Sequence, residues 1–143
     1  MPKMNLKSIA PLLLMVALAT GLTITGEYFG SQVEFAEAIT PEEAFNLIQD
    51  NQGSPDFVIL DVRTPEEFIE GYIEGAVNLD YYAITFDDVL NILDKNMTYL
   101  VYCRSGVRGG KTLALMAKLQ FKEAYNMLGG ITAWQAAGLP VME

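Results

Sequence analysis

Short apolar runs alternate with segments of helical periodicity over residues 39–143. Continuous apolar runs at residues 57–60 and 99–102 are typical of strands buried on both faces of a sheet. Shorter runs predict two further strands, at residues 76–79 and 124–128. Helices are predicted between and around them, over residues 41–50, 65–70, 86–93, 110–119 and 131–137. Strands that alternate with helices predict an α/β fold with a parallel sheet that carries helices on both faces.

Two of the predicted helices begin with the same four-residue pattern, Thr40-Pro41-Glu42-Glu43 and Thr64-Pro65-Glu66-Glu67. Each pattern places threonine at the N-cap, proline at the first helical position and glutamate at the third. This is the capping box, in which the two side chains bond to each other's backbone N–H groups. Residues 40 and 64 are therefore expected to fix two helix starts.

The first 26 residues have a different pattern. Lys3 and Lys7 precede residues 8–26, which carry no charge, and Ala17-Leu18-Ala19 offers small residues for cleavage. This predicts a secretory signal peptide over residues 1–26. An uncleaved signal-anchor stays open because the run is close to the about 20 residues that span a bilayer, and a buried core helix is the third alternative.

The remaining chain divides into a linker over residues 27–38 and a globular domain over residues 39–143. If the first segment is a signal or an anchor, the domain lies outside the cytoplasm. We therefore expect an exported protein, periplasmic or otherwise extracytoplasmic, or one anchored to the membrane by its N-terminal segment.

Composition excludes several kinds of site. The chain has no histidine and one cysteine, so it contains no Ser-His-Asp triad, no histidine-ligated or CxxC zinc site and no internal disulfide. The 18 acidic and 9 basic residues give a net charge of −9, which argues against a nucleic-acid partner because phosphate binding needs a basic face. We expect no metal, and the candidate nucleophile is the thiol of Cys103.

Cys103 directly follows the apolar run at residues 99–102, at the carboxyl end of a predicted strand, where α/β sheets place their ligands. The next residues are small or cationic and lead into a helix, so several N–H groups can converge on the sulfur. Residues 104–122 hold five basic residues and no acidic one. A helix N-terminus and nearby arginines stabilise a thiolate. We expect Cys103 to be a thiolate nucleophile, although a lone cysteine at a strand end is more often a core residue.

Four segments resemble signatures of the rhodanese (sulfurtransferase) family, in the correct order. They are LDVRTPEEF (60–68), GYIEGAVNL (71–79), VYCRSGVR (101–108) and GGITAW with GLPV (129–141). The similarity spans residues 39–143. Tyr72 stands where the family usually carries histidine, which we expect to leave the structure unchanged. Gly109 stands where serine usually follows the loop, and we expect this change to loosen the start of the helix.

The resemblance implies a sulfurtransferase. In that reaction Cys103 accepts a sulfane sulfur from thiosulfate or a similar donor and passes it, as a persulfide, to cyanide or a thiol. The resemblance also implies a loop that holds the persulfide by its N–H groups, formed by Arg104, Ser105, Gly106, Val107, Arg108 and Gly109. The side chains of Arg104 and Arg108 are expected to attract the anionic donor. No cofactor is implied beyond the transient persulfide.

Asp61 and Arg63 follow the neighbouring predicted strand, and two interpretations stay open for them. They form either a surface ion pair in a helix-capping turn or a support that orients the arginines of the loop. The acidic residues of the next segment are expected to form a solvated face; they are Glu66, Glu67, Glu70 and Glu74.

Two other functions stay open. The domain could be a persulfide carrier or binding module for a partner protein, without turnover. It could also be a phosphatase or arsenate reductase of the same fold, but those enzymes separate cysteine and arginine by five residues, and Arg104 to Val107 provide four here. The expected partners are a small anionic sulfur donor, a thiol or cyanide acceptor and a possible protein acceptor. Membrane contact is expected only through an uncleaved N-terminal segment.

Overall fold

The computed structural model describes residues 37–143. The predicted signal segment and residues 27–36 of the predicted linker lie outside the described residues. The elements are β1 (Glu37–Ile39), α2 (Pro41–Asp50), β2 (Phe57–Asp61), α3 (Pro65–Ile69), β3 (Val77–Asn78), α4 (Phe86–Ile92), β4 (Thr98–Tyr102), α5 (Val107–Lys118), β5 (Glu123–Met127) and α6 (Gly130–Ala136). Within residues 37–143, no helix combines the length and the apolar character needed to cross a membrane.

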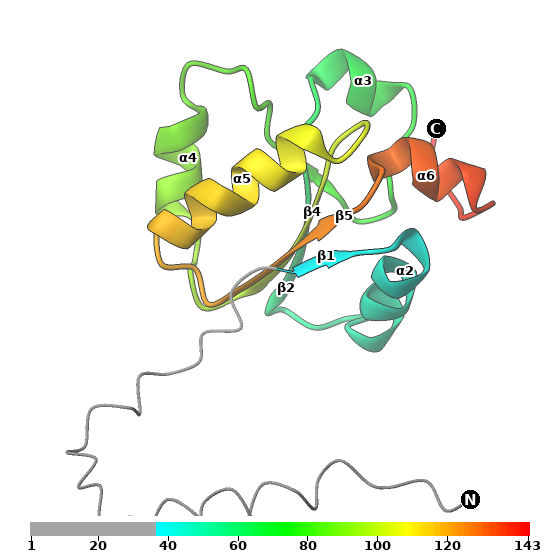
Figure 1. Ribbon diagram of the computed structural model, residues 1–143, viewed down its shortest axis with the longest axis horizontal. Coiled ribbons are helices and arrows are strands. Elements are labelled where there is room, and N and C mark those ends of the chain that lie inside the picture. The colour runs from blue at the N-terminus through cyan, green and yellow to red at the C-terminus, as the bar shows by residue number, and fades with distance from the viewer. Residues whose placement is uncertain (1–36) are drawn as a thin grey trace, which may run out of the picture. The chain divides into compact units, whose positions relative to one another are not determined.

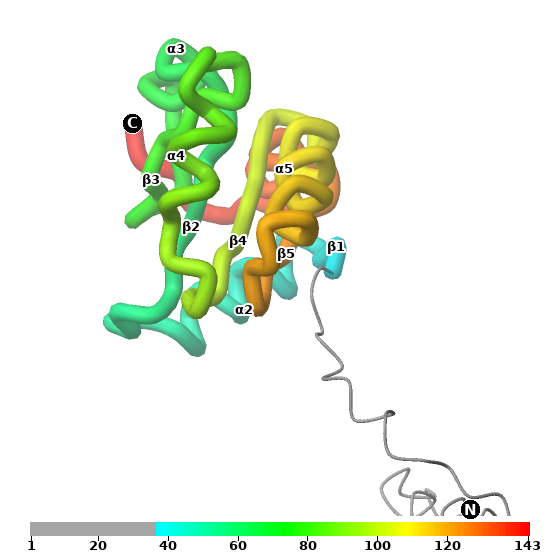
Figure 2. Tube along the Cα trace, turned by 90° about the vertical axis from the view of Figure 1, so that its left-hand side faces the viewer, coloured from blue at the N-terminus to red at the C-terminus, as the bar shows by residue number. Residues whose placement is uncertain are grey.

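The strands form one parallel sheet in the order β1-β5-β4-β2-β3; Figure 1 labels all of these strands except β3, and Figure 2 labels all of them. The central strands β4 and β2 pair over their whole length, from Phe57 with Thr98 to Asp61 with Tyr102. Both are rich in apolar residues because both of their faces are covered. The predicted parallel α/β architecture is confirmed.

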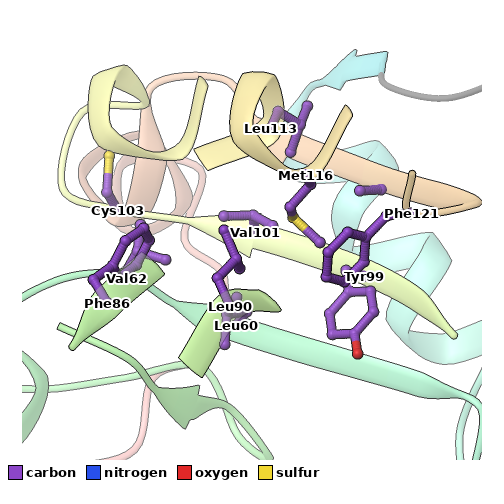
Figure 3. Packing of buried hydrophobic residues seen from close by; sticks show 11 residues of the cluster. Leu60, Val62, Phe86, Leu90, Tyr99, Val101, Cys103, Leu113, Met116 and Phe121 are labelled. Carbon is purple, nitrogen blue, oxygen red and sulfur yellow. The ribbon is translucent and has the colours of Figure 1, made fainter. Parts of the chain in front are cut away.

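Helices cover the two faces of the sheet separately. Helices α4 and α5 lie on one face of the sheet, which is turned toward the viewer in Figure 2. Helices α2 and α6 lie on the other face. The first face is filled by Leu90, Leu113 and Met116, and the second by Ala44, Ile131 and Trp134. Cys103 belongs to the first cluster, at its end nearest the start of α5 (Figure 3).

Both predicted capping boxes are confirmed. The Thr40 side chain accepts from the Glu43 N–H, and the Glu43 carboxylate accepts from the Thr40 N–H. Thr64 and Glu67 repeat this arrangement at α3. Because each box satisfies two N–H groups at a helix start, the short sequence pattern is enough to locate where the helix begins.

The structure corrects two predicted boundaries. Residues Glu37 and Ala38, assigned to the linker, belong to β1, which pairs in parallel with β5 from Glu37–Tyr125 to Ile39–Met127. Three residues are too few for a periodic pattern, so this strand depends on its partner. Helix α5 begins at Val107, one turn before the predicted start at Gly110. The two glycines at 109 and 110 disfavour helix by propensity, and tertiary contacts override that preference.

Candidate active site

The thiol of Cys103 lies directly beyond β4, facing the start of α5 (Figure 3). The residue is fully buried, with 0% of its surface exposed. The Gly106 N–H donates to Cys103 Sγ at 3.0 Å. This contact places a backbone N–H donor directly on the sulfur of the candidate nucleophile.

Gly106 makes this contact possible through its backbone conformation. It is the N-cap of α5 and has φ +95°, in the region that glycine adopts without strain. A Cβ on Gly106 would lie 3.2 Å from the Gly129 nitrogen and 3.4 Å from the Met127 carbonyl oxygen. Both the positive φ and the close backbone neighbours therefore favour glycine over any other residue at position 106. Of the neighbouring loop residues, Arg104 and Ser105 are exposed.

Helix α6 supports the loop from the other side. The Ile131 N–H donates to the Cys103 carbonyl at 2.9 Å, and the Thr132 N–H donates to the Arg104 carbonyl at 3.2 Å. Gly130 has φ +58°, and a Cβ there would overlap the carbonyl oxygens of Cys103 and Arg104. The glycine pair at the start of α6, its N-cap Gly129 and first residue Gly130, therefore lets this helix approach the backbone that carries the thiol.

Arg108, the last residue of the Cys103–Arg108 loop, is held by an acidic residue of α3. Its two terminal nitrogens donate to the two carboxylate oxygens of Glu67, at 2.7 and 2.8 Å. The bonds from Arg108 lower the pKa of Glu67 to about 2. The guanidinium also lies over the ring of Tyr82, 5.5 Å from its centroid. The expected solvated position of Glu67 is wrong, and the Arg108 charge is paired within the protein.

Asp61 and Arg63 are buried, so the surface ion pair, one of the two interpretations left open for them, is wrong. Asp61 is 0% and Arg63 5% exposed. The Arg63 guanidinium bonds to the Asp61 carboxylate, with a shortest distance of 2.6 Å, and to the carbonyls of Glu67 at 3.0 Å and Gly71 at 2.8 Å. It thus holds the helix that carries Glu67, and its contact with the loop arginines runs through that residue.

The two departures from the family pattern have different surroundings. The Tyr72 ring stacks on Phe68, with centroids 4.4 Å apart, and its backbone pairs with Met142. Gly109 lies inside the first turn of α5, where its α-carbon is buried against the side chain of Asn126. The helix starts at Val107, before Gly109, and the expected loosening stays a prediction.

The contacts of two side chains near the loop are not predicted by the sequence. Glu67 was already assigned to the capping box, and nothing in the spacing indicated that its carboxylate also binds Arg108, 41 residues away. Asn126 lies within the predicted strand at residues 124–128, and its amide donates to the Gly106 carbonyl at 3.1 Å. An asparagine in a strand that is otherwise largely apolar is the one local signal that could have marked it.

The chain is similar to proteins of known family. The family model of the rhodanese-like domain matches residues 40–137. A sulfurtransferase from Allochromatium vinosum is 31% identical over 97 residues, which cover 68% of this chain and 89% of that protein. The thiosulfate sulfurtransferase GlpE of Actinobacillus succinogenes is 31% identical over 103 residues, covering 72% of this chain and 87% of that protein.

A solved structure agrees with these relatives. The rhodanese-like domain protein from Staphylococcus aureus superposes with a TM-score of 0.60 at 34% identity, covering 75% of this chain and 99% of that one. Residues 40–137, which the family model matches, contain strands β2 to β5 and the loop that starts at Cys103. With its ordered signatures, its parallel sheet and these matches, the chain belongs to the rhodanese-like domain family.

Proposed function

We propose that this protein is a sulfurtransferase that moves a sulfane sulfur from thiosulfate, or a similar anionic donor, to cyanide or a thiol through a persulfide on Cys103. The observation that carries the proposal is the hydrogen bond from Gly106 to Cys103 Sγ, made at the N-terminus of a twelve-residue helix. This arrangement favours an anionic sulfur without any histidine. Relatives named as sulfurtransferases support it.

The reaction has two steps. The Cys103 thiolate attacks the outer sulfur of thiosulfate, the sulfur–sulfur bond of the donor breaks, and sulfite leaves with the electron pair. The product is a Cys103 persulfide with a terminal negative charge. Cyanide then attacks the outer sulfur and leaves as thiocyanate, which restores the thiolate. A thiolate acceptor reacts in the same way and becomes a persulfide itself.

The charges around the loop assign different roles to its two arginines. The Arg108 side chain is 14% exposed and paired with Glu67, so its charge is compensated before any donor arrives. Arg104 is exposed at the mouth of the loop. We therefore assign the attraction of the anionic donor to Arg104 and the fixing of the loop to Arg108. Because Cys103 is fully buried, donor access requires groups at the mouth of the loop to move aside.

The direct test is the mass of the purified protein after incubation with thiosulfate. We expect the mass of one added sulfur atom on the peptide that contains Cys103, and its loss on addition of cyanide. The matched control is Cys103→Ser, which preserves volume and removes the soft nucleophile. Absence of the adduct on the wild type, or an equal adduct on the serine variant, would overturn the proposal.

Turnover separates this enzyme from the two alternatives. Thiocyanate formed in large excess over protein supports catalysis, whereas one equivalent per chain would indicate a persulfide carrier. Hydrolysis of an aryl phosphate by the wild type would indicate a phosphatase. The pairing of Arg108 with Glu67 weighs against that chemistry, because it occupies both terminal nitrogens that would bind phosphate.

A further inference from the structure

Asn126 is a polar residue buried beneath the start of α5. It lies in β5, where it is paired in register with Val101 of β4 and Ala38 of β1, and it is 6% exposed. Ala124, two residues earlier on the same face of β5, belongs with Met116 to an apolar cluster in which both are almost fully buried. Burying an amide among such residues costs free energy unless the amide is bonded. The amide therefore needs a hydrogen-bond partner inside the protein.

That contact is made with the residue that bonds to the sulfur. Asn126 Nδ2 donates to the Gly106 carbonyl at 3.1 Å, and the Gly106 N–H donates to Cys103 Sγ at 3.0 Å. The same carbonyl also accepts from the Gly110 N–H at 3.0 Å, as the first turn of the helix requires. Gly106 has no side chain that could lock its backbone, so the amide of Asn126 supplies a fixed point for it.

The oxygen of the Asn126 amide has surroundings different from those of its nitrogen. Asn126 Oδ1 is buried and has no hydrogen-bond partner among the described residues. A Cβ on Gly109 would overlap this oxygen, so the glycine at 109 provides the space that Asn126 occupies. The departure from the serine of the family pattern thus matches the position of the amide. An unpaired oxygen is a cost, which the contact with Gly106 must offset.

We propose that Asn126 is a positioning residue for the Cys103 sulfur: it holds the Gly106 backbone so that the N–H stays on Sγ. This deepens the proposed function, on which its catalytic consequence rests. Asn126 does not touch the sulfur and acts through Gly106. Without the amide, the Gly106 carbonyl keeps only its bond from the Gly110 N–H, so the Gly106 N–H that donates to the sulfur is held less firmly before reaction.

The test compares Asn126→Ala with the matched control Thr112→Val. Thr112 is fully buried and donates to the Arg108 carbonyl at 2.9 Å, so its loss removes a buried hydrogen bond from the same helix turn without affecting Gly106. For Asn126→Ala we expect kcat to fall by about tenfold or more and KM for thiosulfate to stay nearly unchanged. The upper limit is the loss of about 10²–10³ in kcat that follows removal of one fixed donor to a reacting anion. Thr112→Val is expected to keep both constants.

A second readout needs no sulfur donor. The rate of Cys103 alkylation by iodoacetamide is measured against pH. A change in access scales the rate at every pH, whereas loss of the N–H contact moves the midpoint of the profile upward. We expect the midpoint to rise in Asn126→Ala and to stay in Thr112→Val. If the midpoint rises in Asn126→Ala but the wild type takes no sulfur from thiosulfate, the proposed function is contradicted and this inference stands.

Gly109→Ala approaches the same contact from the helix. Its methyl group displaces the Asn126 amide, so its alkylation profile should move as that of Asn126→Ala does, and adding it to Asn126→Ala should have little further effect. This variant also covers the case in which Asn126→Ala does not fold. A folded Asn126→Ala or Gly109→Ala with the wild-type profile would overturn the inference.

Discussion

Glu67 and Arg108 join two helices through a bidentate ion pair between residues 41 positions apart in the sequence. Glu67 stands in the first turn of α3 and Arg108 in the first turn of α5, so the pair ties both helix starts together next to the Cys103 loop. Arg63 holds the carbonyl of Glu67 and Asp61 holds Arg63, which extends the network into the core. The charge of Arg108 is thereby paired within the protein.

The Glu67–Arg108 pair predicts a pH-dependent stability. Arg108 lowers the pKa of Glu67 from 4.5 to about 2, so the contribution to stability is complete above about pH 4.5 and is lost as the pH falls toward 2. Because the pair is partly exposed, we expect Glu67→Gln to lower the free energy of unfolding by about 1–3 kcal/mol at neutral pH. Urea unfolding from pH 7 to pH 2 should show this difference shrinking. Glu66→Gln, at an exposed neighbour, is the control, and a difference independent of pH would contradict the prediction.

Arg104 is predicted to attract the anionic donor. Arg104→Ala should raise KM for thiosulfate by about two- to fivefold and leave kcat unchanged, since an exposed charge pair is worth about 0.2–1 kcal/mol. The effect should shrink at high ionic strength. Lys118→Ala removes one charge from the last turn of α5 and serves as the control. An equal rise in KM for both variants would reduce the role of Arg104 to net charge.

Gly130 is predicted to be essential for the position of the Cys103 loop. Gly130 and Gly138 both have positive φ, +58° and +72°, so alanine at either position costs about 1–2 kcal/mol in backbone strain. A Cβ at 138 meets nothing within 4 Å, whereas one at 130 overlaps the Cys103 and Arg104 backbone. We expect Gly138→Ala to keep its rate of thiocyanate formation and Gly130→Ala to lose up to about a hundredfold. Similar rates in two folded variants would refute this.

The N-terminal segment is predicted to direct export. Fractionation of cells that express the full chain should find the domain outside the cytoplasm, either shortened by cleavage near Ala19 or intact in the membrane. A matched chain with Leu14→Lys interrupts the apolar run and should remain in the cytoplasm. Recovery of the intact wild-type chain from the soluble cytoplasmic fraction would rule out both the signal and the anchor.

The sequence by itself determined the features that depend on neighbouring residues. Apolar runs identified the strands at 57–60 and 99–102, and the two capping boxes located the starts of α2 and α3, because their bonds close within four residues. The same holds for the loop after Cys103, whose small and cationic residues precede a helix start. Local patterns were therefore enough to predict the parallel α/β fold and the candidate nucleophile.

Tertiary structure decided which side chains meet. Strand β1 exists through its pairing with β5, and α5 starts at Val107 because Gly106 adopts a positive φ between Cys103 and Asn126. The partner of Arg108 lies 41 residues away and that of Gly106 lies 20 residues away. Neither contact repeats along the chain, so no period or motif records it. Such contacts depend on how the strands order in the sheet and how closely the helices approach, and packing settles both only when the whole domain is assembled.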